Sequence, residues 1–403
     1  MKKSIVWLFL VPLCAFSQEP AKSIHTDSSR SPQWTELLSS KKGIPWKVRK
    51  AVLHGGKQDG VELIEVDNGS LCFQVIPTRG MGILAVQRDS TRFGWNSPVK
   101  EVVHPKYVNL QARGGLGWLD GFNEMMCRCG LENNGGPGKD RFINNVGDEA
   151  TMDLTLHGKI ANIPASKVEV FANPNPPFDI HVKGVVHERM FYGPKLELQV
   201  DISTTPGSHT IKLSETVTNR GALEQEFELL YHSNYGAPLL EEGARFLAPV
   251  AQVTPINENA AKANESYPSY QGPTAGFTEQ VYCLRLNAGN DGFTEALLVN
   301  SKGALAAGIR YRVKELPYFT LWKNTSAVEE GYVTGLEPGT NFPRPRNVER
   351  EHGRVPKLKG GETRNFELDF FFLTQADEVQ SAKERIAAIQ GKRKPVVDIS
   401  PEK

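Results

Sequence analysis

The feature that most constrains the fold is a recurring alternation of apolar and polar residues. In the clearest segment, residues 196–202, four apolar residues alternate with Glu197, Gln199 and Asp201. A period of two is typical of a strand with one buried face. Similar runs recur as far as residue 373, and nearly every gap between them holds Gly, Pro, Asn or Asp. Many short strands with such punctuation predict an all-β sandwich or barrel, and the unbroken signal favours one large domain over residues 46–375.

The two flanks of this domain have a different pattern. Residues 18–45 are polar and predict a lead-in, with a short helix near Ser31 where apolar residues fall at helical spacing. Residues 376–390 carry an apolar stripe of helical period and are followed by Gly391, which predicts a short C-terminal helix that ends there. We expect residues 392–403 to be a loose tail.

The N-terminus has the features of an export signal. Lys2 and Lys3 precede the apolar run 5–13, and the small-x-small triplet 15–17 follows. We therefore expect residues 1–17 to be a cleaved signal peptide and the mature chain to be secreted or periplasmic. The sequence before Cys14 faintly resembles a lipoprotein acceptor site, but Leu13 is bulky there, so lipid anchoring is the weaker alternative.

Composition excludes several classes of function. The 403 residues carry a formal net charge of +1, which argues against a nucleic-acid partner because phosphate binding needs a concentrated basic face. No segment after Leu13 is apolar enough to span a membrane. Four cysteines remain beyond the signal, too few for a disulfide framework, so small buried thiols are favoured over a pair of bridges. The spacing of Cys127 and Cys129 is too tight for the usual zinc motif.

Polar, Gly-rich loops that also carry aromatic residues stand out between the predicted strands. They supply Trp faces, Asn amides, Arg and Lys donors and isolated carboxylates. That mixture suits a sugar, whose ring faces stack on aromatic rings while its hydroxyls need fixed donors and acceptors. Each loop alone is compatible with an ordinary turn, but together they favour a ligand cleft.

Two histidines differ from the other seven. His157 and His232 each end a predicted strand and open a loop rich in Gly and Asn. A zinc site would want a third ligand at short spacing, and none is present, so a metal centre is the weaker hypothesis. Glu337, in the turn-forming setting Gly-Leu-Glu-Pro-Gly, is the carboxylate that we expect to converge with them as an acid/base pair.

Several motifs, in order, resemble the uncharacterised aldose 1-epimerase-like family of the galactose mutarotase-like superfamily. They are "PTRGMGI", "GWNSPV", "RCGLENNG", "LHGKIANIPA", "YHSNYG" and "GYVTGLEPGTNFP". The resemblance covers about residues 45–375 and implies a β-supersandwich that binds carbohydrate in a cleft across one sheet. It also implies that His232 is the general acid, that Glu337 is the general base, and that His157 contacts the sugar.

The resemblance is weaker for the residues that bind substrate. Lys159 follows "LHG" where mutarotases usually carry a second Gly. By spacing, the family's substrate-binding Arg corresponds to Arg128, with Arg141 as the alternative, and its substrate-binding Asp corresponds to Glu279. The further loop residues that we expect at the sugar are Trp118, Lys323 and Asn234.

These expectations define a mechanism and its alternatives. One acid and one base suffice to open and reclose a sugar ring, so the resemblance implies anomer interconversion without a cofactor or metal. The pair is expected as protonated His232 and ionised Glu337, which predicts a bell-shaped pH profile. The alternatives are a lyase or hydrolase of the same superfamily that acts on a glycan, and a carbohydrate-binding protein in which the pair only recognises its ligand.

Overall fold

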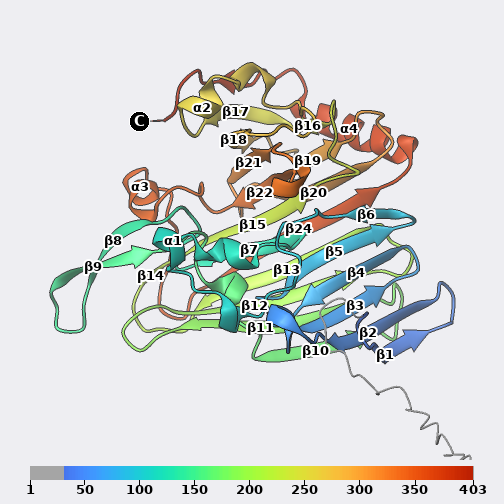
Figure 1. Ribbon diagram of the computed structural model, residues 1–403, viewed down its shortest axis with the longest axis horizontal. Helices are drawn as coiled ribbons and strands as arrows, with labels where there is room; N and C mark the ends of the chain where they lie inside the picture. The colour runs from blue at the N-terminus through green and yellow to red at the C-terminus, as the bar shows by residue number, and fades with distance from the viewer. Residues whose placement is uncertain (1–30, 403) are drawn as a thin grey trace, which may run out of the picture.

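Two large β-sheets packed face to face form the body of the protein (Figure 1). The structure, a computed structural model, describes residues 31–402. The predicted signal peptide, residues 1–17, lies outside the described residues.

The larger sheet has 13 strands in the order β1-β2-β3-β4-β5-β7-β15-β22-β21-β18-β17-β25, with β6 paired to β5. Its strands are β1 (Thr35–Ser40), β2 (Trp46–Val52), β3 (Glu62–Asp67), β4 (Leu71–Ile76), β5 (Gly82–Arg88), β6 (Thr91–Phe93), β7 (Met126–Leu131), β15 (Glu228–Tyr235), β17 (Val250–Pro255), β18 (Gln280–Leu286), β21 (Tyr318–Asn324), β22 (Val333–Gly339) and β25 (Val396–Val397).

The second sheet has eight strands in the order β10-β11-β12-β13-β24-β20-β19-β16. They are β10 (Lys167–Ala172), β11 (Ile180–Arg189), β12 (Lys195–Thr204), β13 (Thr210–Asn219), β16 (Arg245–Leu247), β19 (Phe293–Val299), β20 (Ala306–Arg312) and β24 (Thr363–Leu373). Two small pairs lie outside both sheets: β8 (Gly138–Ile143) with β9 (Glu149–Leu154), and β14 (Gln225–Glu226) with β23 (Lys357–Leu358).

The described helices are short except for the last one. They are α1 (Ala112–Gly115), α2 (Glu258–Ala261), α3 (Arg346–Glu351) and α4 (Ala376–Gln390). The predicted C-terminal helix is confirmed in both position and end, because α4 stops at Gly391, which has a positive φ of 56°. Val379, Ala382 and Ile386 form its buried stripe, which packs on the second sheet.

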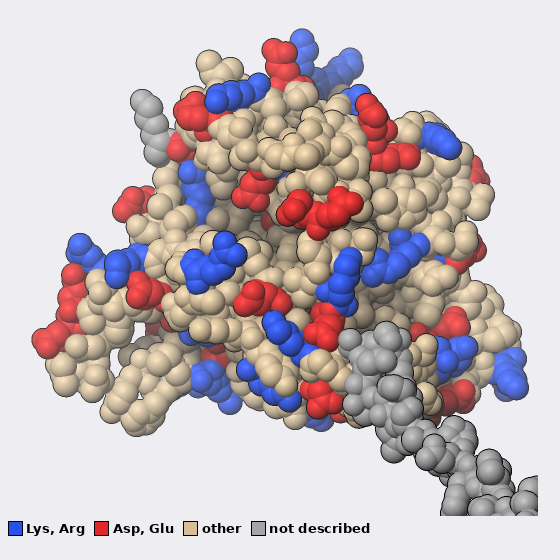
Figure 2. All heavy atoms as spheres, viewed as in Figure 1, with Lys and Arg blue, Asp and Glu red and all other residues tan. Residues whose placement is uncertain are grey.

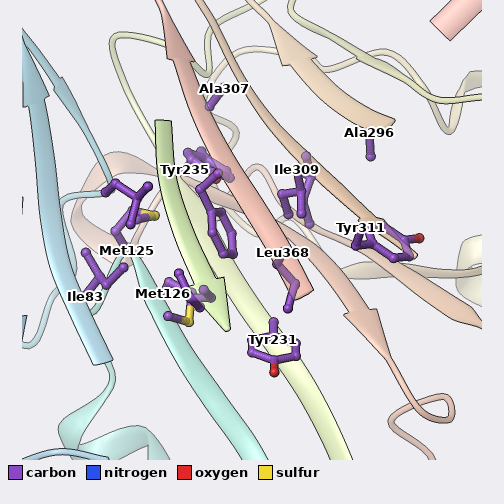
Figure 3. Packing of buried hydrophobic residues seen from close by; sticks show 14 of the residues in the cluster. Ile83, Met125, Met126, Tyr231, Tyr235, Ala296, Ala307, Ile309, Tyr311 and Leu368 are labelled. Atoms are coloured by element: carbon purple, nitrogen blue, oxygen red, sulfur yellow. The ribbon is translucent and has the colours of Figure 1, made fainter. Parts of the chain in front are cut away.

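The core lies between the two sheets and confirms the predicted all-β class. In β12 the apolar residues Leu198, Val200 and Ile202 are buried, as the alternation predicts. Figure 3 shows part of this core, with Tyr231 and Tyr235 of β15 projecting among side chains of neighbouring strands. Each fully buried aliphatic side chain contributes roughly 1.5–3 kcal/mol of transfer free energy, so the sandwich needs no disulfide to hold it.

The prediction for the N-terminal flank is wrong. Thr35–Ser40 forms strand β1 instead of a helix, antiparallel to β2 with Thr35 opposite Lys50. Pairing with β2 supplies backbone partners at once, whereas a short isolated helix would have to nucleate without a packing surface. Leu38 packs against the main core from this edge strand.

The C-terminal tail is not loose, which corrects a second prediction. After α4 the chain returns to the larger sheet, where β25 pairs in parallel with β17. The Asp398 carboxylate accepts hydrogen bonds from Gln252 Nε2 at 2.8 Å and Thr254 Oγ1 at 2.5 Å. These bonds fix the tail at the sheet edge.

The cysteines, the helices and the surface charges can be described for residues 31–402. All four cysteines in this range are unpaired, and three of them are buried. No helix in the described range is long and apolar enough to cross a membrane. Lys and Arg intermingle with Asp and Glu over the face shown in Figure 2, which displays no large patch of one sign.

Candidate functional site

The predicted acid/base pair meets in the middle of the larger sheet. His232 on β15 lies opposite Cys127 of β7, and the register of β15 with β22 brings it opposite Glu337. Nε2 of His232 is 3.2 Å from Oε1 of Glu337, and both side chains are almost fully buried. Because Tyr231, the preceding residue, points into the core between the sheets, His232 points to the outer face.

Aromatic rings surround the pair on this outer face. The His232 ring centroid lies 5.2 Å from that of Phe122, 5.5 Å from that of Trp322 and 6.1 Å from that of Trp118. Trp118 lies in a 3-10 turn, Gly117–Gly121, and Trp322 lies on β21. Apolar faces beside polar atoms are the surroundings in which a sugar ring can stack.

His157 enters the site from a strained turn. Its φ is +58°, a left-handed conformation that residues with a side chain rarely adopt, and Gly158 follows at +68°. A Cβ at Gly158 would overlap the carbonyl oxygens of Asn133 and Gly130, so the turn requires glycine there. This places the His157 ring centroid 5.3 Å from that of His232, so the two rings lie together on the outer face.

A single hydrogen bond fixes the tautomer of His157. Its Nδ1 lies 2.8 Å from the carbonyl oxygen of Asn134, which can only accept, so Nδ1 carries the proton and Nε2 is left as an acceptor. Burial lowers the pKa of His157 to about 4, and the bond to Asn134 opposes that shift. At neutral pH His157 is therefore an uncharged acceptor.

Asn134 is itself held by two buried groups. Its backbone N–H donates to Oε2 of Glu228 at 2.8 Å, and its Nδ2 donates to Oδ1 of Asn341 at 2.9 Å. Asn341 lies on the segment that follows Glu337, so these bonds tie the loop that orients His157 to the strand that carries the carboxylate.

Burial favours the uncharged form of both members of the pair. It lowers the pKa of His232 well below its ordinary value, with nearby His157 adding to the shift and Asn234 opposing it. Burial also raises the pKa of Glu337 well above its ordinary value, and the Glu279 carboxylate adds to the rise. Burial thus opposes the expected pair of a protonated His232 and an ionised Glu337, and it favours a neutral imidazole beside a carboxylic acid.

Several buried polar atoms around the pair have no hydrogen-bond partner in the described part of the chain. Glu337 Oε1 is one of them, because its approach to His232 meets the distance but not the geometry of a hydrogen bond. Unpaired buried polar atoms are costly and rare, so a cluster of them marks a place where a ligand or water supplies the partners. The atoms are His232 Nδ1, Glu337 Oε1, Asn234 Oδ1, Thr320 Oγ1 and Trp118 Nε1.

Arg128 is not part of this cluster, contrary to prediction. It pairs across the strands with Tyr231, not with the outward-facing His232, and so points between the sheets. Its Nε lies 2.9 Å from both carboxylate oxygens of Glu215, and none of its side chain is exposed. One step along a strand reverses the face, which spacing in sequence does not reveal. The alternative, Arg141, is exposed on β8 and paired with Glu149.

Lys323 is also turned away from the site. It follows Trp322 on β21, and its Nζ donates to the carbonyl oxygen of Ser269 at 2.8 Å while lying over the Tyr270 ring. Burial lowers the pKa of Lys323 to about 8. This correction has the same cause as the one for Arg128, because adjacent strand residues occupy opposite faces.

The structure does bring the remaining predicted residues together. Glu279 accepts a hydrogen bond from Trp322 Nε1 at 2.8 Å, at the exposed rim. Asn234 lies two residues after His232 on the same face, and its amide donates to the carbonyl oxygen of Glu124 at 3.0 Å. Trp118 is buried against His157, with ring centroids 4.7 Å apart.

Three residues at the site were missed by sequence reasoning: Phe122, Asn134 and Thr320. Phe122 and Asn134 fall inside the polar, Gly-rich loops whose composition predicts a ligand cleft. The sequence therefore indicates these loops but not these two residues within them. Thr320 falls inside another such segment, residues 320–324, which the structure places on strand β21.

The all-β double sheet matches the fold of solved galactose mutarotase-like proteins. A "putative aldose 1-epimerase" from Klebsiella pneumoniae is 38% identical, with a TM-score of 0.86 over 94% of this chain and 98% of its own. One described in the same words from Escherichia coli K12 is 16% identical, with a TM-score of 0.52 over 78% and 99%. A galactose mutarotase-like protein from Clostridium acetobutylicum is 14% identical, with a TM-score of 0.54 over 85% and 99%. The last two show the fold alone.

Family membership follows from the sequence match. Residues 58–371 match the family described as "Domain of unknown function (DUF4432)", and the chain belongs to that family. No curated protein matches the chain. The predicted resemblance to aldose 1-epimerase-like and mutarotase-like proteins is confirmed.

Proposed function

We propose that the protein is an aldose 1-epimerase-like isomerase that interconverts the anomers of a sugar at His232 and Glu337. The observation that carries the proposal is the cluster of unpartnered polar atoms that faces the pair within a ring of aromatic side chains. A polyhydroxylated sugar ring offers hydrogen-bond partners to these polar atoms and an apolar face that can stack on the aromatic rings. The 38% identity with a structure described as a "putative aldose 1-epimerase" supports the same reaction class.

The reaction needs one proton donor and one proton acceptor. As the bond between the anomeric carbon and the ring oxygen breaks, its electron pair goes to the ring oxygen, which takes a proton from the acid. The base removes the proton of the anomeric hydroxyl, and the product is the open-chain aldehyde. Rotation about the adjacent carbon–carbon bond and the reverse proton transfers give the other anomer and restore the pair.

His232 and Glu337 hold one transferable proton whichever of them carries it. Burial favours neutral His232 with protonated Glu337. The ion pair of imidazolium and carboxylate contains the same number of protons, so the two states differ only in which group carries the shared proton. Either state supplies one acid and one base.

His157 and the aromatic rings hold the sugar in place. The Nε2 of neutral His157 accepts from a sugar hydroxyl, since Nδ1 is committed to Asn134. Trp118, Phe122 and Trp322 exclude water from the pair, which strengthens the electrostatic interactions within the site.

Exchange NMR on a panel of free aldoses tests the proposal. The wild-type chain should accelerate anomer exchange for at least one sugar, and His232→Ala and Glu337→Gln should abolish the acceleration. His54→Ala is the matched control, because the His54 side chain is exposed and forms an ion pair with Asp59 at the surface. Exchange that survives in both site variants would refute the assignment, and binding without exchange would make the protein a carbohydrate-binding protein.

A further inference from the structure

A groove lies between the loop that carries His157 and the end of the protein where the β8–β9 hairpin stands apart from both sheets (Figure 1). Its volume of about 880 Å³ falls within the range of about 300–1,000 Å³ that is typical of ligand sites. The hairpin forms one wall, and the turn after β11 and the loop after β13 form the other. Neither His232 nor Glu337 lines it, so the groove is a surface distinct from the acid/base pair.

The groove begins beside His157. Thr155 and Lys159 line it and lie two residues before and after His157 in the chain, so each Cα is within about 7.6 Å of that of His157. Leu110, another lining residue, packs against the buried cluster that contains Trp118 of the site. A ligand at this end of the groove is therefore next to a sugar bound at His157.

Large apolar side chains line the outer part of the groove although they are exposed to solvent. Five of them, each more than half exposed, are Ile143, Met190, Phe191, Tyr192 and Leu223. Phe191 is 81% exposed and Tyr192 is 62% exposed, with ring centroids 4.3 Å apart. Single exposed apolar residues are ordinary, but several around one groove mark a binding surface. Aromatic faces that are open to solvent can stack on the apolar face of a sugar ring.

Each charged side chain in the groove lining already has a partner within the chain. Lys159 pairs with Glu132 at 2.9 Å, and Arg350 pairs with Glu226 at 2.7 Å. The Lys195 ammonium donates to two backbone carbonyl oxygens, each at 3.1 Å. The remaining charged residues of the lining also form ion pairs. An ionic ligand would therefore find no unpaired charge here, which favours a neutral one.

Unpaired amides supply the polar component of the groove. Gln111 and Asn145 line it with exposed side chains, and neither side chain forms a hydrogen bond within residues 31–402. An amide carries both donors and an acceptor, so it can pair with sugar hydroxyls without contributing a charge. Open aromatic rings and free amides together suit a neutral, polyhydroxylated ligand.

We infer that this groove binds a neutral oligosaccharide whose reducing-end sugar lies at His157. The inference rests on the proposed function for that sugar and extends it, because the substrate becomes the end of a glycan chain. Phe191 and Tyr192 stack on the rings of the further sugar residues, and the amides of Gln111 and Asn145 pair with their hydroxyls. A second copy of the chain could also cover the apolar side chains, but it would not require a groove that begins beside His157.

Binding and exchange measurements with sugars of different length test the inference. The probes are maltotriose, cellotriose, xylotriose and β-1,4-mannotriose against glucose, xylose and mannose, with dissociation constants from calorimetry and reducing-end exchange from NMR. The wild-type chain should bind at least one trisaccharide about tenfold or more tightly than its monosaccharide. The double variant Phe191→Ala/Tyr192→Ala should bring that ratio close to one, and it should melt at the wild-type temperature because both side chains are exposed.

Phe178→Ala is the matched control. Phe178 is also an exposed aromatic residue, but it precedes β11 whereas Phe191 follows it, so the ten residues of that strand, about 33 Å, lie between them. This variant should keep the wild-type ratio of affinities. An equal loss in Phe178→Ala, or trisaccharide binding that survives in the double variant, would overturn the inference.

The remaining outcomes separate the inference from the proposed function. Exchange of monosaccharides without tighter binding of any trisaccharide would overturn the inference and leave the proposed function standing. Trisaccharide binding that depends on Phe191 and Tyr192, without exchange of any sugar, would support the groove and overturn the proposed function. A dimer in sedimentation that the double variant dissociates would assign the apolar side chains to a second copy and overturn the inference. No sugar binding at all would overturn both.

Discussion

Gly335 and Glu337 lie two residues apart on the same face of β22, and the glycine makes room for the carboxylate. A Cβ built at Gly335 would overlap Oε1 of Glu337 and would crowd the Trp322 ring at 3.2 Å. The absence of a side chain at Gly335 is therefore a condition for the geometry of the acid/base pair.

Gly335→Ala should impair the proposed reaction by displacing Glu337 from His232. A displacement of about 1 Å at a reacting group costs on the order of 100-fold in rate, so we expect a loss of that size in anomer exchange. Gly136→Ala is the control, since a Cβ there meets only one atom, of Pro345, at 4.0 Å. Undiminished exchange in Gly335→Ala would show that the position of the carboxylate does not matter.

Removal of either member of the pair should cost roughly 100- to 10,000-fold in the rate of exchange, the usual contribution of general acid–base catalysis. Because the two groups act on one substrate in one step, the double variant His232→Ala/Glu337→Gln should be little worse than the slower single variant. Rates from exchange NMR check this. Strictly multiplicative losses would contradict a concerted pair.

The rate should depend on pH through the loss or gain of one proton by the pair. On the acid side it should fall as neutral His232 takes up a proton, well below the ordinary pH range for histidine because burial lowers its pKa. On the alkaline side it should fall as Glu337 loses its proton, well above the ordinary range for a carboxyl because burial raises its pKa. The expected pH profile is a broad bell, with its maximum in the pH range where the pair holds one shared proton. A profile with a limb near pH 6.5 would indicate a solvent-exposed histidine instead.

Glu228→Gln should remove part of the dependence of stability on pH. Burial raises the pKa of Glu228 to about 8, so between pH 4.5 and 8 the unfolded chain has lost a proton that the folded chain keeps. The wild-type free energy of unfolding should therefore fall as pH rises through this window, by up to about 1.4 kcal/mol per pH unit from this group. Glutamine keeps the acceptor for the Asn134 N–H, so Glu228→Gln should retain the fold with a flatter profile, as urea titrations at several pH values would show.

Arg128→Met should reduce stability rather than sugar affinity. The substitution would leave Glu215 buried without its cation, and breaking such a pair costs roughly 3–5 kcal/mol. The double variant Arg128→Met/Glu215→Gln should recover part of that loss. Denaturant unfolding and sugar binding measured on the same samples check both statements. Weaker sugar binding at unchanged stability would restore Arg128 to the site.

The sequence was sufficient to predict the sandwich and the central pair. Strands of the second sheet have one face on the core, so the alternation of apolar and polar residues is visible in the sequence. Helix α4 ends at Gly391, as the sequence predicts. His232 and Glu337 were identifiable because each falls in an unusual motif at the end of a predicted strand.

Other residues were misplaced for a specific physical reason. Every residue of β7 is buried, because one face packs on the second sheet and the other lies under the loops of the site. Such a strand shows no alternation, and nothing local reveals that Cys127 faces outward and Arg128 inward. The strands at the two edges, β1 and β25, were missed for different reasons. The apolar residues of β1 also fit a helical spacing, whereas β25 has only two residues and pairs in parallel with the distant strand β17.

The tail that returns to the sheet has a consequence for assembly. With β25 in place, the outer edge of β17 is occupied by the chain's own backbone and by the Asp398 carboxylate. Without that cover, β17 would present a row of free N–H and C=O groups, which is a template for strands of neighbouring molecules. The segment after α4 thus covers this edge of β17, and a fusion placed there would have to leave residues 396–398 free to dock.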